Sequence, residues 1–103
     1  ISGIKLFKNL EKLYINNNKL ENIFVIKNLI KLKVLYLNSN PLKDISAIKN
    51  LNNLEILRID NLELGLDQIK YINCIKNLKE LFCHKGFNFF VLNRFNKNLR
   101  IYK

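Results

Sequence analysis

Residues 10–20 carry a pattern of leucine, isoleucine and asparagine that returns along the chain about every 22 residues. The first copy reads LEKLYINNNKL, and the second, at residues 32–42, reads LKVLYLNSNPL. Further copies begin at Leu54 and Leu78, and a partial copy ends the chain at residues 99–102. A period of this length that persists through a whole chain is typical of solenoids, in which each unit packs against its neighbours. The repeat therefore predicts a stack of similar turns.

Each unit contains two shorter periodicities that predict its local structure. In LYI at residues 13–15, aliphatic residues alternate with tyrosine, which is the period of a β-strand with the aliphatic side chains directed inward. In ISAIKNL at residues 45–51, every third residue is aliphatic, which suits a 3₁₀ or short helical segment with one buried stripe. Each unit is therefore expected to form a strand, a turn and a helical return, with successive strands parallel and about 4.8 Å apart.

Asn18 and Asn40 occupy the same place in the first two units, where the chain turns after its strand. Such a turn leaves backbone N–H and C=O groups partly buried, and an asparagine amide offers both donors and an acceptor. We therefore expect these two residues to form a structural ladder of hydrogen bonds between turns. Leu62 and Gly86 take the same place in later units, so the ladder should stop after two rungs.

The return segment of the third unit is longer than its counterparts by two residues. Its sequence, LGLDQIKYINCIKNL at residues 64–78, places Asp67 before an apolar pattern of helical spacing. Aspartate is favoured at the N-cap because its carboxylate accepts hydrogen bonds from free backbone N–H groups. The sequence thus predicts Asp67 as an N-cap, followed by a longer and more helical return than those at 22–29 and 45–51.

The motif LxxLxLxxNxL, followed by apolar residues at intervals of three, resembles the leucine-rich repeat. The 22-residue unit is similar to internalin-like repeats and to those of a protein-phosphatase regulatory subunit, most closely in PLKDISAIKNLNNLEILRI at residues 41–59. The resemblance covers residues 1–101 and implies an α/β solenoid. Its expected form is a right-handed superhelix with a short parallel β-sheet on the concave face and 3₁₀ or short α segments on the convex face. It also implies a protein-binding scaffold, although fold analogy does not transfer a particular partner.

We expect residues 1–103 to form one leucine-rich repeat domain, with repeats starting near 10, 32, 54 and 78 and a partial strand at 99–102. Because residue 1 is isoleucine rather than methionine, the chain is expected to be a fragment of a longer protein. No apolar run reaches the roughly 20 residues of a membrane helix, so no membrane insertion is expected. The oligomeric state does not follow from the sequence, and a cytoplasmic or nuclear location is favoured over secretion.

The strand pattern directs one row of side chains outward, between the two buried positions of each strand. By this alignment the row contains Tyr14, Tyr36, Arg58, Phe82 and Arg100, flanked by Val34 and Ile56. Aromatic residues and arginine are enriched at the energetic centres of protein interfaces. The sequence therefore predicts that this row binds another protein. The alternative is that the aromatic residues are simply good neighbours across strands, with arginine stacked on their rings.

The size of this face limits the affinity that we expect from it. Five strands about 4.8 Å apart, each exposing roughly 15–20 Å of length, present about 400 Å². A standard interface buries about 800 Å² from each partner. Binding should therefore be weak unless loops, edges or further repeats contribute.

The formal net charge of +10 raises a second hypothesis, a basic nucleic-acid-binding surface. Only three of the eighteen basic residues are arginine, and heavy use of lysine, asparagine and isoleucine is the profile of an AT-rich coding sequence. The lysines are also predicted to lie around the whole solenoid, which makes nucleic acid the less favoured partner. A third hypothesis is a structural spacer within a longer repeat protein.

Catalytic and metal-binding chemistry has few candidate residues in this chain. His84 is the only histidine, and the side chain of Cys83 next to it is predicted to lie on the opposite, buried face of the strand. Cys74 is expected on the outer surface. Two cysteines and one histidine are too few for a tetrahedral zinc site, and no glycine-rich phosphate loop is present. The sequence predicts no enzymatic activity, no metal site and no cofactor.

Overall fold

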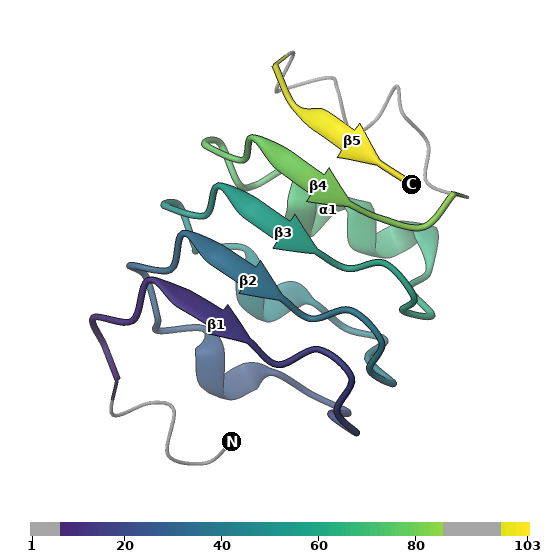
Figure 1. Ribbon diagram of the computed structural model, residues 1–103, viewed down its shortest axis with the longest axis horizontal. Helices are drawn as coiled ribbons and strands as arrows, with labels where there is room; N and C mark the ends of the chain where they lie inside the picture. The colour runs from purple at the N-terminus through teal and green to yellow at the C-terminus, as the bar shows by residue number, and fades with distance from the viewer. Residues whose placement is uncertain (1–6, 86–97) are drawn as a thin grey trace.

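The computed structural model describes residues 7–85 and 98–103, which form a stack of turns with one sheet (Figure 1). The sheet has five parallel strands in the order β1-β2-β3-β4-β5, so each turn adds its strand beside the previous one. The strands are β1 (Lys12–Tyr14), β2 (Val34–Tyr36), β3 (Ile56–Arg58), β4 (Glu80–Phe82) and β5 (Arg100–Tyr102). The predicted solenoid with parallel strands is confirmed.

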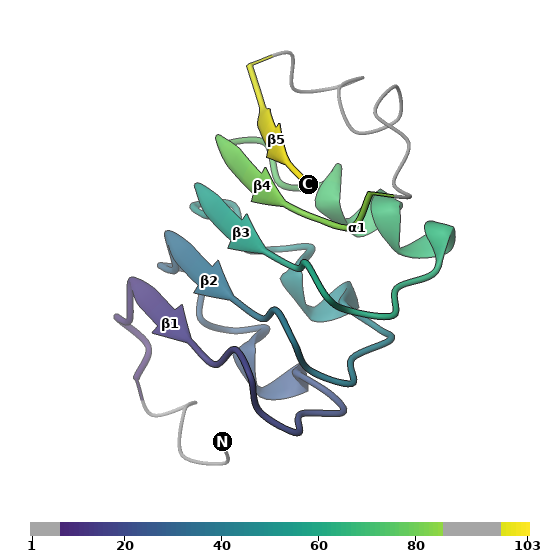
Figure 2. The ribbon, with the colours of Figure 1, turned by 45° about the vertical axis from the view of Figure 1, so that its right-hand side comes forward.

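The return segments lie behind the sheet, as the rotated view in Figure 2 shows. They are η2 (Phe24–Ile26), η3 (Ser46–Ile48), η4 (Leu66–Gln68) and α1 (Ile69–Ile72), of which the first three are 3₁₀ helices. The third return is the longest, as predicted, because its extra residues allow η4 to continue directly into α1.

The predicted N-cap at Asp67 is wrong. Gly65 is the N-cap of η4, Gln68 is the N-cap of α1, and neither helix start has a side-chain capping bond. Asp67 instead lies inside η4, where its Oδ2 accepts a hydrogen bond from Nε2 of Gln68 at 3.1 Å. The helical segment begins at Leu66, earlier than the apolar pattern suggests. Asp67 therefore lies in the first turn of η4 rather than at the N-cap position before it.

Aliphatic side chains from consecutive turns fill the space between the sheet and the return segments. Leu35 and Leu57 are paired in register on neighbouring strands, and both are fully buried. Ile26 in η2 and Ile48 in η3 are also fully buried, and they fill the core from the helical side. Each fully buried aliphatic side chain contributes roughly 1.5–3 kcal/mol, but only because the adjacent turn supplies the other wall of its site. Stability therefore depends on contact between turns.

The turn after each of the first three strands contains one residue with a left-handed backbone. These residues are Asn17, Ser39 and Asn61, with φ values of 58°, 61° and 56°. The left-handed conformation costs most L-residues about 1–2 kcal/mol, and asparagine tolerates it better than most. The repeated strain bends the chain away from the sheet at the same point of each turn. The repeat pattern does not predict this feature.

A row of alternating charge precedes the strands. Glu11, Lys33, Glu55 and Lys79 follow one another from turn to turn. Lys33 Nζ lies 3.4 Å from Glu11 Oε1, and Lys79 Nζ lies 3.3 Å from Glu55 Oε1. Exposed pairs of this kind contribute a fraction of a kcal/mol each, and they favour the observed register because opposite charges face each other across strands.

Candidate functional site

The outward side chains of the five strands form a continuous stack, here called the aromatic row. Its members, paired in register from strand to strand, are Tyr14, Tyr36, Arg58, Phe82 and Tyr102. The rings of Tyr14 and Tyr36 meet edge to face with centroids 4.7 Å apart, and those of Phe82 and Tyr102 are stacked at 4.7 Å. The guanidinium of Arg58 lies 5.3 Å from the ring centroid of Tyr36 and 5.0 Å from that of Phe82. One cation thus joins two aromatic pairs.

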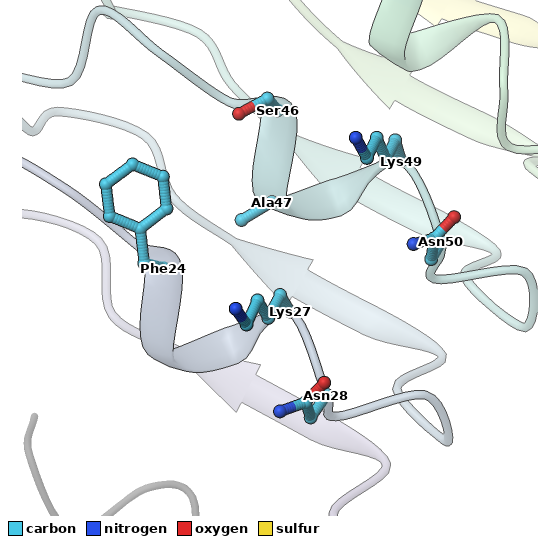
Figure 3. A pocket seen from close by; sticks show the side chains of 7 residues that line it. All are labelled: Phe24, Lys27, Asn28, Ser46, Ala47, Lys49 and Asn50. Carbon is cyan, nitrogen blue, oxygen red and sulfur yellow. The ribbon is translucent and has the colours of Figure 1, made fainter.

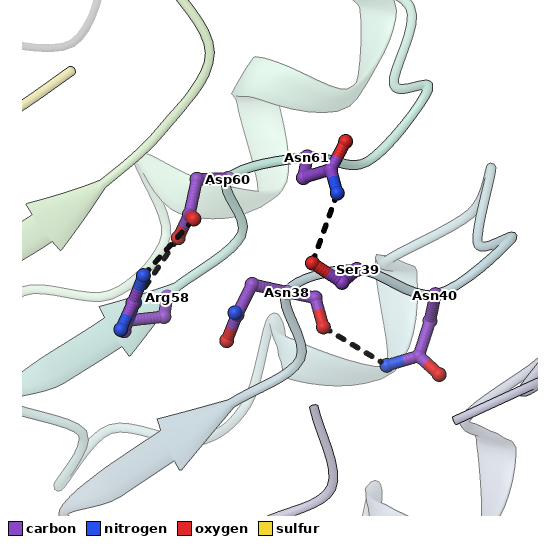
Figure 4. Close-up of polar contacts among 6 residues, drawn as sticks. All are labelled: Asn38, Ser39, Asn40, Arg58, Asp60 and Asn61. Carbon is purple, nitrogen blue, oxygen red and sulfur yellow. Dashed lines mark hydrogen bonds and ion pairs between the residues drawn. The ribbon is translucent and has the colours of Figure 1, made fainter. Parts of the chain in front are cut away.

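Asp60, which follows β3, holds Arg58 in this position (Figure 4). Arg58 Nε donates to Asp60 Oδ1 at 3.1 Å, and Arg58 Nη2 donates to Asp60 Oδ2 at 3.0 Å. These hydrogen bonds raise the pKa of Arg58 above its ordinary value, against a smaller opposing effect of burial. A guanidinium has five N–H groups, so three remain after Asp60 has taken two. The result is a fixed hydrogen-bond donor in the middle of an aromatic surface.

The aromatic row is open to solvent, most of all at its two ends. Tyr14 and Tyr102 are exposed, whereas Tyr36, Arg58 and Phe82 are half-buried by their neighbours in the row. Val34 and Ile56, which are paired in register, lie beside the row and are also half-buried. Together these side chains form an apolar strip interrupted by one oriented charge.

The structure places Arg100 in a different row from the one predicted. Arg100 pairs in register with Glu80, and its Nη2 lies 3.6 Å from Glu80 Oε2, so it flanks the aromatic row. Tyr102 takes the predicted place and stacks on Phe82. The reason is that Ile101, rather than Leu99, pairs with the buried Leu81. The alternation of Leu99 and Ile101 is compatible with two registers that differ by two residues, and stacking and charge pairing favour the observed one.

The amides of Asn18 and Asn40 hydrogen-bond the turns behind the sheet edge. Asn40 Nδ2 donates to the carbonyl oxygens of Leu37 at 2.8 Å and of Ile15, in the preceding turn, at 2.9 Å. Asn40 Oδ1 accepts from the backbone N–H of Asn18 at 3.0 Å and of Leu20 at 3.3 Å. The buried Asn40 amide therefore binds two turns together.

In the third turn Leu62 is buried at the corresponding place, and Gly86 lies outside the described residues. A different contact connects the second and third turns, since Asn61 Nδ2 donates to Ser39 Oγ at 3.0 Å (Figure 4). Deeper in the stack, Gln68 Oε1 accepts from the backbone N–H of Ile45 at 2.8 Å. Sequence reasoning missed Gln68, because glutamine has no fixed place in the repeat motif.

Comparison with known proteins agrees with the geometry. Residues 8–50 match the family described as leucine-rich repeats (2 copies). The solved structure of an internalin, inlF, from Listeria monocytogenes superposes with a TM-score of 0.90 and is 28% identical over 100% of this chain. The chain is a leucine-rich repeat protein. Its five parallel strands and short return helices are those of internalin repeat domains.

This leucine-rich repeat protein is also similar in fold to internalin C2 from Listeria monocytogenes, with a TM-score of 0.83 and 24% identity over 100% of the chain. The chain spans 31% of the inlF chain and 45% of the internalin C2 chain, so it corresponds to part of each. A comparison with curated proteins found no match.

The leucine-rich repeat protein has its two cysteines in contrasting environments. Cys83 is buried in the core, which raises the pKa of its thiol, an effect that nearby Lys103 partly offsets. Cys74 is exposed, and its Sγ lies 3.3 Å from the carbonyl oxygen of Lys70. In residues 7–85 and 98–103, no three His, Cys, Asp or Glu side chains are grouped so that they could hold a metal ion. Within the same residues, no helix is long and apolar enough to cross a membrane.

A thiol reagent should therefore modify one cysteine of the native protein. We expect Cys74 to react within minutes at pH 8 and Cys83 to react only after denaturation, because a buried, protonated thiol is a poor nucleophile. The measurement is the number of thiols titrated with and without denaturant. Cys74→Ser is the control and should leave the native protein without a reactive thiol; a native reaction of that variant would contradict the burial of Cys83.

Proposed function

We propose that this leucine-rich repeat protein binds another protein through the aromatic row, with Tyr14, Tyr36, Arg58 and Phe82 as the main anchors. The observation that carries the proposal is the unbroken stack of rings and guanidinium on a solvent-open sheet face. Val34 and Ile56 extend the apolar area on one side, and Arg100 adds a charge beside it. Repeat domains of this kind typically serve as protein-interaction modules.

The side chains of the aromatic row are already held in place before a partner binds, which favours binding. A partner that immobilises a mobile side chain loses roughly 0.5–1.5 kcal/mol of binding free energy for each one. Here the rings already restrain one another, and Asp60 already restrains Arg58. A pre-ordered surface therefore retains more of the energy gained when its rings are buried.

We also infer that the protein is not an enzyme. Folds of this type are usually non-catalytic, and the carboxylates of Asp60 and Glu80 on the sheet face each form an ion pair with an arginine. Arg58 and Asp60 form a bidentate pair that leaves neither group in a strained or unpaired state. Such a pair orients a donor for binding but supplies no nucleophile or general base.

Nucleic acid is the second candidate partner for the sheet face, and charge pairing weighs against it. Each of the four carboxylates on this side, those of Glu11, Glu55, Asp60 and Glu80, lies within ion-pair distance of a basic side chain. The cations beside the aromatic row are thus partly neutralised. Binding to phosphate should fall steeply with salt, whereas binding through the rings should change modestly. A salt titration of the bound complex distinguishes the two partners.

Removal of two rings tests the proposed function directly. The double variant Tyr14→Ala and Tyr36→Ala should bind a protein captured on the immobilised wild-type chain at least about 30-fold more weakly, because anchors of this type contribute about 2 kcal/mol or more. The measurement is the dissociation constant by surface plasmon resonance, with circular dichroism as the test of folding.

Phe24→Ala is the matched control for this experiment. Phe24 is 56% exposed and Tyr14 is 55% exposed, but Phe24 lies in η2 on the opposite side of the stack. The control should bind the captured protein like the wild type. Unchanged affinity in a folded double variant, or equal losses in the double variant and the control, would remove the aromatic row from the interface.

A further inference from the structure

The helical side of the stack carries more lysines than carboxylates. Segments 22–32, 45–54 and 68–78, which cover η2, η3, α1 and the turns that lead back to the strands, contain no aspartate or glutamate. Two carboxylates lie next to them: Asp67 is within η4, and Asp44 Oδ1 accepts a hydrogen bond from the backbone N–H of Ser46 at 2.8 Å. Their exposed lysines, here called the basic side, are Lys27, Lys31, Lys49, Lys70 and Lys76. The carboxylates lie beside the sheet, in the loops after the strands or, for Asp67, at the start of the third return. The sequence predicted lysines around the whole solenoid, and the fold gathers five of them on this side with fewer carboxylates beside them.

The five lysines of the basic side form no ion pair within the described residues. The ion pairs found in the described residues all involve side chains on or beside the sheet, and none includes a lysine of the basic side. Lys31 Nζ donates to Asn9 Oδ1 at 2.9 Å, and Lys70 Nζ lies 5.2 Å from the ring centroid of Tyr71. Both partners are uncharged, so the positive potential of this side remains available to an anionic ligand.

A shallow hollow between η2 and η3 combines these charges with an exposed ring (Figure 3). Lys27 and Lys49 occupy the same place in successive turns, and Figure 3 shows their side chains extending in the same direction. Phe24 stands beside them at the rim of the hollow and is largely exposed. Ile30, in the turn that follows η2, is also largely exposed. The basic side therefore presents apolar groups among its cations.

This combination favours an anionic lipid surface over a polynucleotide. Lysines beside exposed aromatic and aliphatic side chains are typical of proteins that adsorb at a membrane interface, with cations at the phosphates and rings at the headgroup boundary. Lysine attracts the phosphates of either partner, whereas single-stranded nucleic acids are bound through rows of aromatic side chains on which the bases stack. In the described residues those groups lie on the sheet face, in the aromatic row.

We propose that the basic side docks on the surface of a membrane that contains anionic lipids, without insertion of a helix. Lys27 and Lys49 contact headgroup phosphates, and Phe24 packs at the boundary between headgroups and acyl chains. The aromatic row then faces away from the membrane, because the sheet and the return segments lie on opposite sides of the stack (Figure 2). The docked chain presents its protein-binding face to the solvent.

Vesicle co-sedimentation of the full chain tests this docking. The wild type should bind phosphatidylcholine vesicles that contain about 30 mol% phosphatidylserine, should not bind pure phosphatidylcholine vesicles, and should be released as salt is raised. The double variant Lys27→Gln and Lys49→Gln should bind about 25-fold more weakly, or about fivefold for each lysine. Phe24→Ala should bind roughly tenfold more weakly, because the ring no longer enters the interface.

The double variant Lys12→Gln and Lys79→Gln is the matched control, since it removes the same charge from side chains on or beside the sheet and should retain vesicle binding. Circular dichroism checks that every variant is folded. Three results would overturn the proposal: no binding to anionic vesicles, equal loss in the two double variants, or wild-type binding by Phe24→Ala.

Duplex DNA at equal phosphate concentration is the competitor. Release of vesicle-bound protein by DNA, with Phe24→Ala binding that DNA like the wild type, would instead assign the basic side to polynucleotide.

Discussion

The Leu35→Asp variant should lose cooperative unfolding altogether. Leu35 is 0% exposed and lies between Leu13 and Leu57 in register, so the new carboxylate would be surrounded by aliphatic groups. Burial of an unpaired charge costs several kcal/mol even after relaxation, which is comparable with the about 5–15 kcal/mol that stabilises a typical domain. The measurement is thermal unfolding followed by far-ultraviolet circular dichroism.

Leu66→Asp is the matched control, because it makes the same substitution at a leucine that is 66% exposed. This variant should melt within a few degrees of the wild type. A cooperative transition near the wild-type temperature in Leu35→Asp would mean that the stacked strands do not enclose a common core.

Substitution of Asn40 by leucine should produce the second-largest loss of stability. Leucine has nearly the same size but removes five hydrogen bonds, three donated by the Asn40 amide and two accepted by its Oδ1. The carbonyl oxygen of Leu37 and the backbone N–H groups of Asn18 and Leu20 would lose these bonds, at about 1–3 kcal/mol for each group that finds no other partner. The carbonyl oxygen of Ile15 keeps its bond from Asn18 Nδ2. We expect the free energy of unfolding to fall by about 3 kcal/mol, measured by urea denaturation.

Asn18→Leu provides the comparison within the same ladder. Asn18 is exposed, and its Nδ2 donates to the carbonyl oxygens of Ile15 and Asn16, where water can replace it. This variant should lose about 1 kcal/mol or less. Equal losses for the two substitutions, or no loss for Asn40→Leu, would show that the inter-turn bonds of Asn40 contribute little to stability.

The strands and return segments could be predicted because both follow from short-range periodicity. Alternation at residues 13–15 and spacing by three at residues 45–51 each specify one buried face, and the constant repeat length aligns those faces from turn to turn. The first four members of the aromatic row follow from the same alignment. The physical requirement is simple: each turn must bury the same positions as the turn before it.

The features that could not be predicted depend on contacts between turns or on changes of unit length. The last unit differs in length, so periodicity alone could not decide whether Arg100 or Tyr102 joins the aromatic row; the pairing of Ile101 with Leu81 decides it. The left-handed turn at Ser39 has no signal in its residue type, since serine does not favour positive φ. The bond from the backbone N–H of Ile45 to Gln68 depends on the insertion that starts η4.

The alternating row of Glu11, Lys33, Glu55 and Lys79 constrains how the number of repeats can change. Loss of one unit, such as residues 33–54, would bring Glu11 opposite Glu55 on adjacent strands, where like charges repel. Loss of two consecutive units would bring Glu11 opposite Lys79 and preserve attraction. Recombination that removes or adds an even number of repeat units should therefore be tolerated better than recombination that removes or adds an odd number.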